Sequence, residues 1–193
     1  MTTDAVPRAL AKACAGAGPA APGDAVAGLA PRYAAAPATI GEASALLGAA
    51  AAEGLAVVAR GTGSKLSWGA PPERCDLVLD MTRLDQVLEH AAGDLVVKAQ
   101  AGVRLDKLSE VLAGAGQQLA IDLPAANRAP GQPAARAGGP GSGTGTVGGL
   151  LATGIAGPRR LRYGTPRDLV IGVTMIRADG TVARSGGKVV KNV

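Results

Sequence analysis

An apolar run at residues 55–59 (LAVVA) passes directly into a polar, glycine-rich loop at residues 60–65 (RGTGSK). The run predicts a buried strand, because it is short, rich in apolar residues and followed closely by glycine. Gly61 and Gly63 allow a ligand to approach the backbone closely, and consecutive N–H groups in such a loop form an anion site. The remaining side chains of the loop supply hydroxyl groups and positive charge: Arg60, Thr62, Ser64 and Lys65. We interpret this stretch as a pyrophosphate cradle; a plain polar turn is the alternative.

The composition restricts both the core and the partners of the chain. Hydrophobic residues make up 47% of the 193 residues, but aromatic residues only 2%, with no Phe. The core must therefore consist of Ala, Val, Leu and Ile, in one domain or two small ones. The net charge of +5 favours anionic ligands. The scarcity of aromatic residues and the lack of a basic stripe argue against a nucleic-acid partner.

The sequence gives no signal for export, membrane insertion or metal binding. No apolar run reaches the length of about 18 residues that a membrane span needs, and no secretory leader is evident. The two cysteines fit neither a metal site nor a disulfide framework. His90 is the only histidine, which disfavours a zinc site or a Ser-His-Asp triad. We therefore expect a cytoplasmic protein without a transmembrane segment and without bound metal.

Apolar periodicity predicts alternating strands and helices up to residue 123. A helix at residues 40–53 begins with a capping box, formed by Thr39 and Glu42, and a helix at 104–113 is amphipathic. Residues 1–30 are expected to be loosely ordered, apart from a short helix at 8–15. Strands are expected at 32–36, 56–59, 76–80 and 118–123, with a hairpin at 84–100 that turns at Gly93-Asp94.

The composition changes at residue 124. Residues 124–145 are almost wholly small or polar and predict a flexible link. A second glycine-rich element follows at 146–154, and Asp179-Gly180 turns a hairpin between strands at 169–176 and 181–185. The predicted organisation consists of an N-terminal segment 1–30, a first subdomain 31–123, the link 124–145 and a second subdomain 146–193.

The chain contains two partial matches to familiar nucleotide-binding motifs, and neither match is complete. Residues 143–148 (GTGTVG) have the spacing of a dinucleotide fingerprint, but no strand precedes them and no acidic residue follows at the required distance. Gly187-Lys188 resembles the end of a P-loop, but Val189 replaces the required Ser or Thr. We reject both motifs.

The two glycine-rich elements together resemble the FAD-binding domain of the vanillyl-alcohol oxidase and p-cresol methylhydroxylase (PCMH-type) superfamily. The nearest likeness is to the FAD-binding subunit of bacterial glycolate oxidase and to related FAD-linked 2-hydroxy-acid oxidases. The resemblance lies in residues 58–65 with Trp68-Gly69, in 146–149 with Thr153 and Gly157, in 162–164 with Asp168, 169–173 and Asp179-Gly180, and in 188–193.

The resemblance implies an α+β fold in which FAD lies between two α+β subdomains. It implies an FAD-dependent oxidoreductase, a flavoprotein that oxidises a 2-hydroxy acid such as glycolate or lactate. The fold would be incomplete at its C-terminal end, and the substrate domain would be absent, so no catalytic residue is assigned. The cofactor-binding residues that it implies are Arg60, Gly61, Thr62, Gly63, Ser64, Lys65, Thr146, Gly148, Gly149, Thr153, Gly164 and Val173.

The first loop also departs from one pattern of this superfamily. Some members attach the flavin covalently through a histidine of that loop, whereas Ser64 or Lys65 stands there in this chain. We therefore expect FAD to be held non-covalently. The alternative is a non-catalytic, truncated domain of the same fold or an assembly subunit, and partner oxidase subunits are a further expectation.

Overall fold

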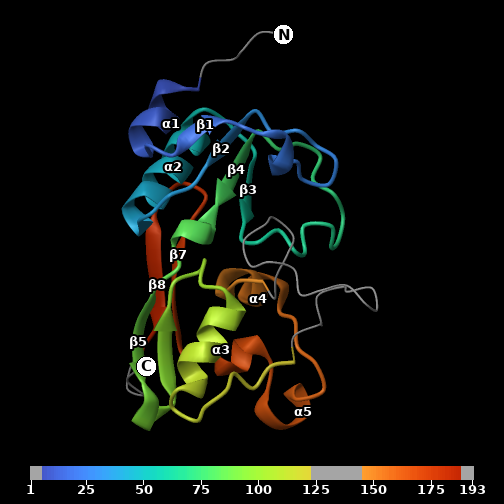
Figure 1. Ribbon diagram of the computed structural model, residues 1–193. Coiled ribbons are helices and arrows are strands. Elements are labelled where there is room, and N and C mark those ends of the chain that lie inside the picture. Colours follow the sequence, from blue (N-terminus) through green and yellow to red (C-terminus); the bar gives the residue numbers. More distant parts are fainter. Residues whose placement is uncertain (1–5, 123–144, 188–193) are drawn as a thin grey trace. The chain divides into compact units, whose positions relative to one another are not determined.

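The computed structural model describes residues 6–122 and 145–187, and shows the α+β class that the sequence predicts (Figure 1). The chain forms two compact units that interleave along the sequence. The first comprises Met1–Arg60, Leu66–Arg83 and Ile171–Val193, and the second comprises Gly61–Lys65 and Leu84–Val170. These units do not follow the successive subdomains 31–123 and 146–193, because the C-terminal hairpin packs with the first unit.

The first unit contains a sheet, two α-helices and a hairpin. Its elements are α1 (Arg8–Ala13), β1 (Ala17–Pro19), η1 (Pro22–Asp24), β2 (Tyr33–Ala35), α2 (Ile40–Ala52), β3 (Val57–Arg60), β4 (Leu77–Asp80), η2 (Met81–Arg83), β7 (Gly172–Ile176) and β8 (Val182–Gly186).

The four-stranded sheet of this unit has the order β1-β2-β4-β3. β2, β4 and β3 run parallel, whereas β1 runs antiparallel to β2. Alternate residues of β4 serve opposite faces: Leu77 and Leu79 pack in one core cluster with Leu46 of α2, and Val78 packs in another with Val26. β3 lies at the edge of the sheet and is half-buried, so the prediction of a strand here is confirmed but that of a buried strand is not.

Local signals account for α2 and for the hairpin β7–β8. Thr39 Oγ1 accepts a hydrogen bond from the Glu42 N–H at 3.1 Å, as the capping box predicts. The Glu42 carboxylate bonds one residue earlier than predicted, to the Ala38 N–H at 2.7 Å. The hairpin turns at Asp179-Gly180 as expected, and Ser44 Oγ of α2 donates to the Gly180 carbonyl at 2.6 Å.

The N-terminal segment is more ordered than the sequence predicts. The expected helix at 8–15 forms as α1, but the remainder is not loose: β1 pairs with β2, and Val26 is fully buried. This order could not be predicted from the Ala, Gly and Pro content of the segment. The segment is stabilised by the sheet beside it rather than by a strand propensity of its own residues.

The second unit contains a hairpin, one 3-10 helix and four α-helices among its described residues. Its elements are β5 (Val87–Ala91), η3 (Ala92–Asp94), β6 (Val96–Ala99), α3 (Leu105–Ala113), α4 (Val147–Thr153), α5 (Arg160–Tyr163) and α6 (Pro166–Leu169). One core cluster joins α3 to the hairpin through Leu108 and Val97, and another joins α3 to α4 through Leu105 and Leu150.

Three further expectations differ from the structure or fall outside it. Residues 118–122 form no strand, because their polar side chains bind another loop instead of a neighbouring strand. The predicted link 124–145 lies outside the described residues except for Gly145, as does the segment 188–193. Within the described part of the chain, no helix has the length and apolarity that crossing a membrane requires.

Candidate functional site

β3 places Arg60 at its last position, and the glycine loop follows directly. Arg60 pairs with Asp80 across the β3–β4 ladder, and its Nη2 lies 2.9 Å from Asp80 Oδ2 and 2.8 Å from Asp24 Oδ1. Burial alone would lower the pKa of Arg60, but hydrogen bonds from its guanidinium to both carboxylates outweigh this and raise it. The Arg60 charge is therefore neutralised inside the protein.

The backbone of the loop offers donors that nothing else in the described structure uses. No hydrogen bond joins the N–H groups of Gly61, Thr62, Gly63 or Ser64 to any residue that the structure describes. Gly63 has a φ of 77°, a conformation that favours glycine. Consecutive free N–H groups form a concave site for anionic oxygen, so this loop has the chemistry of a phosphate cradle.

The second glycine-rich element lies directly against the first. A Cβ at Gly61 would overlap Thr146 Oγ1 and would stand 2.9 Å from Thr146 Cγ2. Thr146 is buried, and its Oγ1 accepts the Gly149 N–H at 3.2 Å, which caps α4. Glycine at position 61 is therefore required by space, and the two predicted loops do come together.

Lys65 lies along the other side of the same junction. Its Nζ would stand 3.2 Å from a Cβ at Gly145, and it lies 3.3 Å from Ser64 Oγ. Thr62 Oγ1 lies 3.5 Å from the same Ser64 hydroxyl. Two hydroxyls and one ammonium thus form a polar rim next to the free N–H groups of the loop.

The start of α4 does not offer a second set of donors. The Val147 N–H bonds the Val103 carbonyl at 2.9 Å, and the Gly148 N–H bonds the Ala101 carbonyl at 2.8 Å. A Cβ at Gly148 would stand 3.0 Å from the Ala101 Cβ, so this glycine serves close packing. Thr153 Oγ1 donates back to the Gly149 carbonyl at 2.8 Å. Of the four residues predicted here, Thr146 packs against Gly61, whereas Gly148, Gly149 and Thr153 serve the packing and capping of α4.

The last two predicted cofactor-binding residues, Gly164 and Val173, lie on elements other than the two glycine-rich ones. Gly164 ends α5 with a φ of 84° and packs against Asp168, in the second unit. Val173 lies in β7, in the first unit.

Sequence reasoning missed two residues of this junction. Gly145, which we assigned to the link, has a φ of 95° and contacts Lys65 and Ser64. Ala101 accepts the Gly148 N–H, and nothing in its sequence context marks it. Of these two residues, Gly145 was the easier to predict, because a glycine directly before a helix-capping Thr often makes a sharp entry to the helix.

The arrangement fits an anionic cofactor and offers nothing for a metal. Groups of three or more potential metal ligands are absent from residues 6–122 and 145–187. Four N–H groups that no described residue bonds, two hydroxyls and one ammonium match the acceptor oxygens of a diphosphate. The residues present therefore fit the diphosphate of a dinucleotide such as FAD.

Comparison with protein families gives this fit a definite context. A family profile described as the FAD binding domain matches residues 31–186. An FAD-linked oxidoreductase of Mycobacterium tuberculosis is 33% identical over 161 residues, which are 83% of this chain and 31% of that protein. The D-lactate dehydrogenase of Archaeoglobus fulgidus is 34% identical over 151 residues, or 78% and 30%. The glycolate oxidase subunit GlcE of Escherichia coli is 32% identical over 137 residues, or 71% and 34%.

Solved structures agree at the level of the fold. An alkyldihydroxyacetonephosphate synthase superposes on 82% of this chain, and on 26% of its own, with a TM-score of 0.61 at 22% identity. A berberine bridge enzyme superposes on 80% of this chain, and on 28% of its own, with a TM-score of 0.61 at 15% identity.

The chain spans about a third of the length of the curated relatives that it matches. The match nevertheless covers most of the chain itself, including both glycine-rich elements and the hairpin β7–β8. The chain therefore belongs to the PCMH-type FAD-binding domain family, whose cofactor is FAD.

Proposed function

We propose that the loop Gly61–Lys65 holds the diphosphate of FAD non-covalently, in the service of a flavin-dependent oxidoreductase. One observation supports this above all: no described residue bonds the N–H groups of Gly61, Thr62, Gly63 and Ser64, in a loop whose Gly61 packs against Thr146. Gly164 and Val173 remain proposed contacts to the rest of the cofactor. Arg60 is proposed to act indirectly, because both of its neighbouring carboxylates already bind it.

The residues of the cradle bind and orient; they do not react. The N–H groups donate to the phosphate oxygens, the Thr62 and Ser64 hydroxyls add donors, and Lys65 supplies the positive charge. When bound, FAD would supply the redox chemistry, which in flavoenzymes of this kind is hydride transfer from the substrate. No histidine lies in the loop, and neither Ser64 nor Lys65 provides the imidazole that covalent attachment uses in some relatives. We therefore propose that the bound FAD is dissociable.

The proposed substrate is a 2-hydroxy acid such as glycolate or lactate. The matched relatives include a D-lactate dehydrogenase, D-2-hydroxyglutarate dehydrogenases and glycolate oxidase subunits, all of which are named for 2-hydroxy acids. Turnover of glycolate and D-lactate with an artificial electron acceptor, in protein purified from its own host, tests this. Activity on neither acid, with FAD bound, would favour the non-catalytic alternative.

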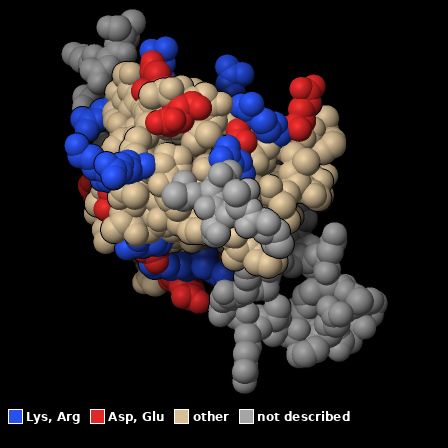
Figure 2. Space-filling model, turned by 90° about the horizontal axis from the view of Figure 1, so that it is seen from above, with Lys and Arg blue, Asp and Glu red and all other residues tan. Residues whose placement is uncertain are grey.

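Companion subunits are part of the proposal. Two of the relatives are subunits of glycolate oxidase, and this chain spans 34% and 26% of their lengths. We therefore propose that this chain works together with partner oxidase chains in the cytoplasm, where its two free thiols would remain reduced. On the face that Figure 2 draws, basic and acidic side chains are interspersed, which does not favour a nucleic-acid partner instead.

The cofactor proposal is tested by titrating the purified protein with FAD and following flavin fluorescence. We expect saturable binding, and we expect acid precipitation to leave the yellow flavin in the supernatant. Flavin that stays with the pellet would contradict non-covalent binding. A folded protein that binds no FAD would contradict the cradle itself.

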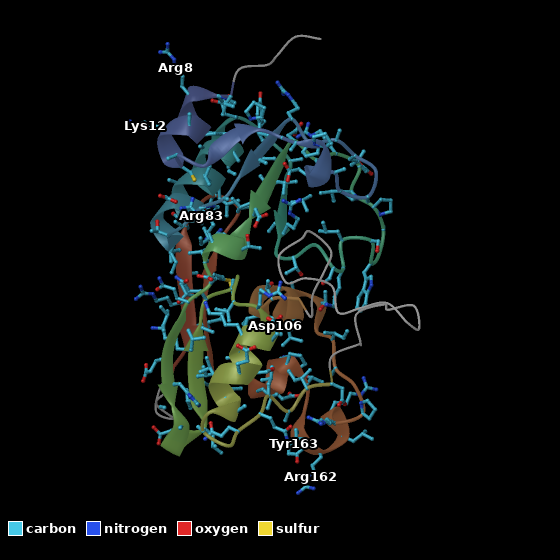
Figure 3. All side chains as sticks on the ribbon, viewed as in Figure 1. Arg8, Lys12, Arg83, Asp106, Arg162 and Tyr163 are labelled. Atoms are coloured by element: carbon cyan, nitrogen blue, oxygen red, sulfur yellow. The ribbon has the colours of Figure 1, made fainter. Side chains whose placement is uncertain are left out.

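Lys65→Gln separates the role of charge from that of the backbone. One lost charge-assisted contact of about 1.5–3 kcal/mol weakens FAD binding about 10- to 100-fold, and the salt dependence of the dissociation constant should decrease as well. The matched control is Lys12→Gln in α1, an exposed cation whose removal should leave FAD affinity unchanged (Figure 3). Equal effects of the two substitutions would contradict a specific role for Lys65.

A further inference from the structure

α5 is a helix of four residues, Arg160–Tyr163, that buries none of its side chains. Leu161 is 89% exposed and Tyr163 is 45% exposed. Figure 3 shows Arg162 and Tyr163 projecting from the ribbon into open space. An element that adds nothing to a core must be held by other contacts, and those contacts are polar.

The start of α5 is fixed by a carboxylate. Asp122 Oδ2 accepts the Arg159 N–H at 2.7 Å, and Asp122 Oδ1 lies 3.1 Å from Arg159 Nε. Gln118 Oε1 accepts from the same guanidinium at 3.3 Å. Gly157 lies so close that a Cβ there would stand 2.7 Å from Asp122 Oδ2. One carboxylate thus holds both the backbone and the side chain of Arg159.

The end of α5 is fixed by a second carboxylate. Gly164 reverses the chain with a φ of 84°, and a Cβ there would stand 2.8 Å from the Asp168 Cβ. Asp168 Oδ2 accepts from the Thr165 N–H and from its hydroxyl, both at 2.7 Å. The turn is therefore preorganised at both ends, which reduces the entropy lost when it binds a partner.

The side chains so presented have the chemistry of an interface. Neither Arg160 nor Arg162 forms an ion pair with a described residue, and the Arg162 guanidinium lies 5.4 Å from the centre of the Tyr163 ring. Arg and Tyr are enriched in protein interfaces and among their energetic anchors. Between residues 145 and 187 every cation is arginine, whose planar fork binds carboxylates in a bidentate manner.

We propose that α5 is the docking point for the companion subunit, at a surface where carboxylates surround an apolar pocket. Leu161 would fill the pocket, and Arg160 and Arg162 would pair with the carboxylates. The inference rests on the companion subunit proposed above and supplies its contact surface. A protein fits better than an anionic membrane, because one short turn with a single leucine offers little apolar area to a bilayer.

The test is a photocrosslink in the host cell. Leu161 is replaced by p-benzoylphenylalanine in the full chain, with the same replacement at the exposed Arg8 of α1 as the control (Figure 3). We expect position 161, but not position 8, to crosslink to one other protein, at a peptide that contains Asp or Glu. Adding Arg160→Glu and Arg162→Glu should reduce the yield about tenfold or more, and reversing the contacted carboxylate to Arg should restore it.

Several outcomes would overturn the inference: no crosslink at position 161, a crosslink to a lipid or to this chain itself, equal yields at both positions, or no recovery upon charge reversal. Sedimentation with vesicles of phosphatidylglycerol and phosphatidylcholine provides the membrane arm, and binding that Arg160→Glu abolishes would also count against a protein partner. FAD content is measured on the same samples. A crosslink without FAD would contradict the cofactor proposal alone, and FAD without a crosslink would contradict the docking proposal alone.

Discussion

The Cα of Gly61 packs against the side chain of Thr146, so closely that a methyl group on it would overlap Thr146 Oγ1. The two residues are far apart in the sequence, yet their contact brings the first loop, whose N–H groups no described residue bonds, against the capped start of α4. The position of the proposed cradle therefore depends on the absence of a side chain at position 61.

Gly61→Ala should weaken both stability and FAD binding. Overpacking of this kind costs about 1–3 kcal/mol, and a displaced loop loses contacts to the diphosphate. Denaturant unfolding and FAD titration measure the two effects. The control is Gly93→Ala, where a Cβ meets nothing within 4 Å and both quantities should be nearly unchanged.

A double-mutant cycle tests whether Thr146 causes the effects of Gly61→Ala. Thr146→Gly removes the obstructing atoms, together with a buried side chain and its cap, so it is itself destabilising and serves as the second single mutant of the cycle. Gly61→Ala should therefore be much less harmful in the Thr146→Gly background, with a coupling of about 0.5–3 kcal/mol. Additive effects would show that the strain lies elsewhere.

Local signals in the sequence were sufficient for much of the fold. The cap at Thr39 and the Asp179-Gly180 turn act within a few residues, so α2 and the β7–β8 hairpin were predictable. The glycines of the cradle were equally visible. The structure of residues 118–122 could not be predicted in the same way, because Asp122 binds Arg159, 37 residues further along the chain.

Arg60 shows why the site was harder to predict than the fold. In the sequence it is one of two cations in a glycine-rich loop, and phosphate binding is its natural interpretation. Its carboxylate partners lie 36 and 20 residues away, on elements that only the folded sheet brings together. The sequence contains the charge, but tertiary pairing determines what the charge does.

Arg60→Gln should therefore affect stability more than cofactor binding. It leaves the half-buried carboxylates of Asp24 and Asp80 without their cation, which should cost about 1–4 kcal/mol of unfolding free energy. Arg74→Gln is the matched control, because Arg74 is exposed and its pair with Asp76 should contribute only about 0–1 kcal/mol. Urea unfolding compares the two. An Arg60→Gln protein of normal stability that binds FAD poorly would restore Arg60 to the cofactor site.

Acid should weaken the same network in a defined pH range. Burial alone would raise the pKa of Asp24, but hydrogen bonds from the Ala21 N–H and from Arg60 outweigh it and lower that pKa. The stabilisation is therefore complete above the unfolded pKa of about 3.9 and is lost as the pH falls through the folded value. Unfolding measured between neutral pH and pH about 3 should show a smaller loss of stability in Asp24→Asn than in the parent. Identical slopes would contradict this assignment.

Gly180→Ala tests the contact that joins the C-terminal hairpin to α2. A Cβ at Gly180 would stand 2.6 Å from the Ser44 carbonyl oxygen and 2.9 Å from the Gly48 nitrogen, and the φ of 85° is unfavourable for alanine. Because the Ser44 hydroxyl also bonds the Gly180 carbonyl, the turn cannot move away without losing that bond. We expect a destabilisation of about 1–3 kcal/mol, measured by thermal or denaturant unfolding. Gly23→Ala, where a Cβ meets nothing within 4 Å, should change stability little, and a similar loss in both variants would show that the hairpin contact with α2 is not the cause.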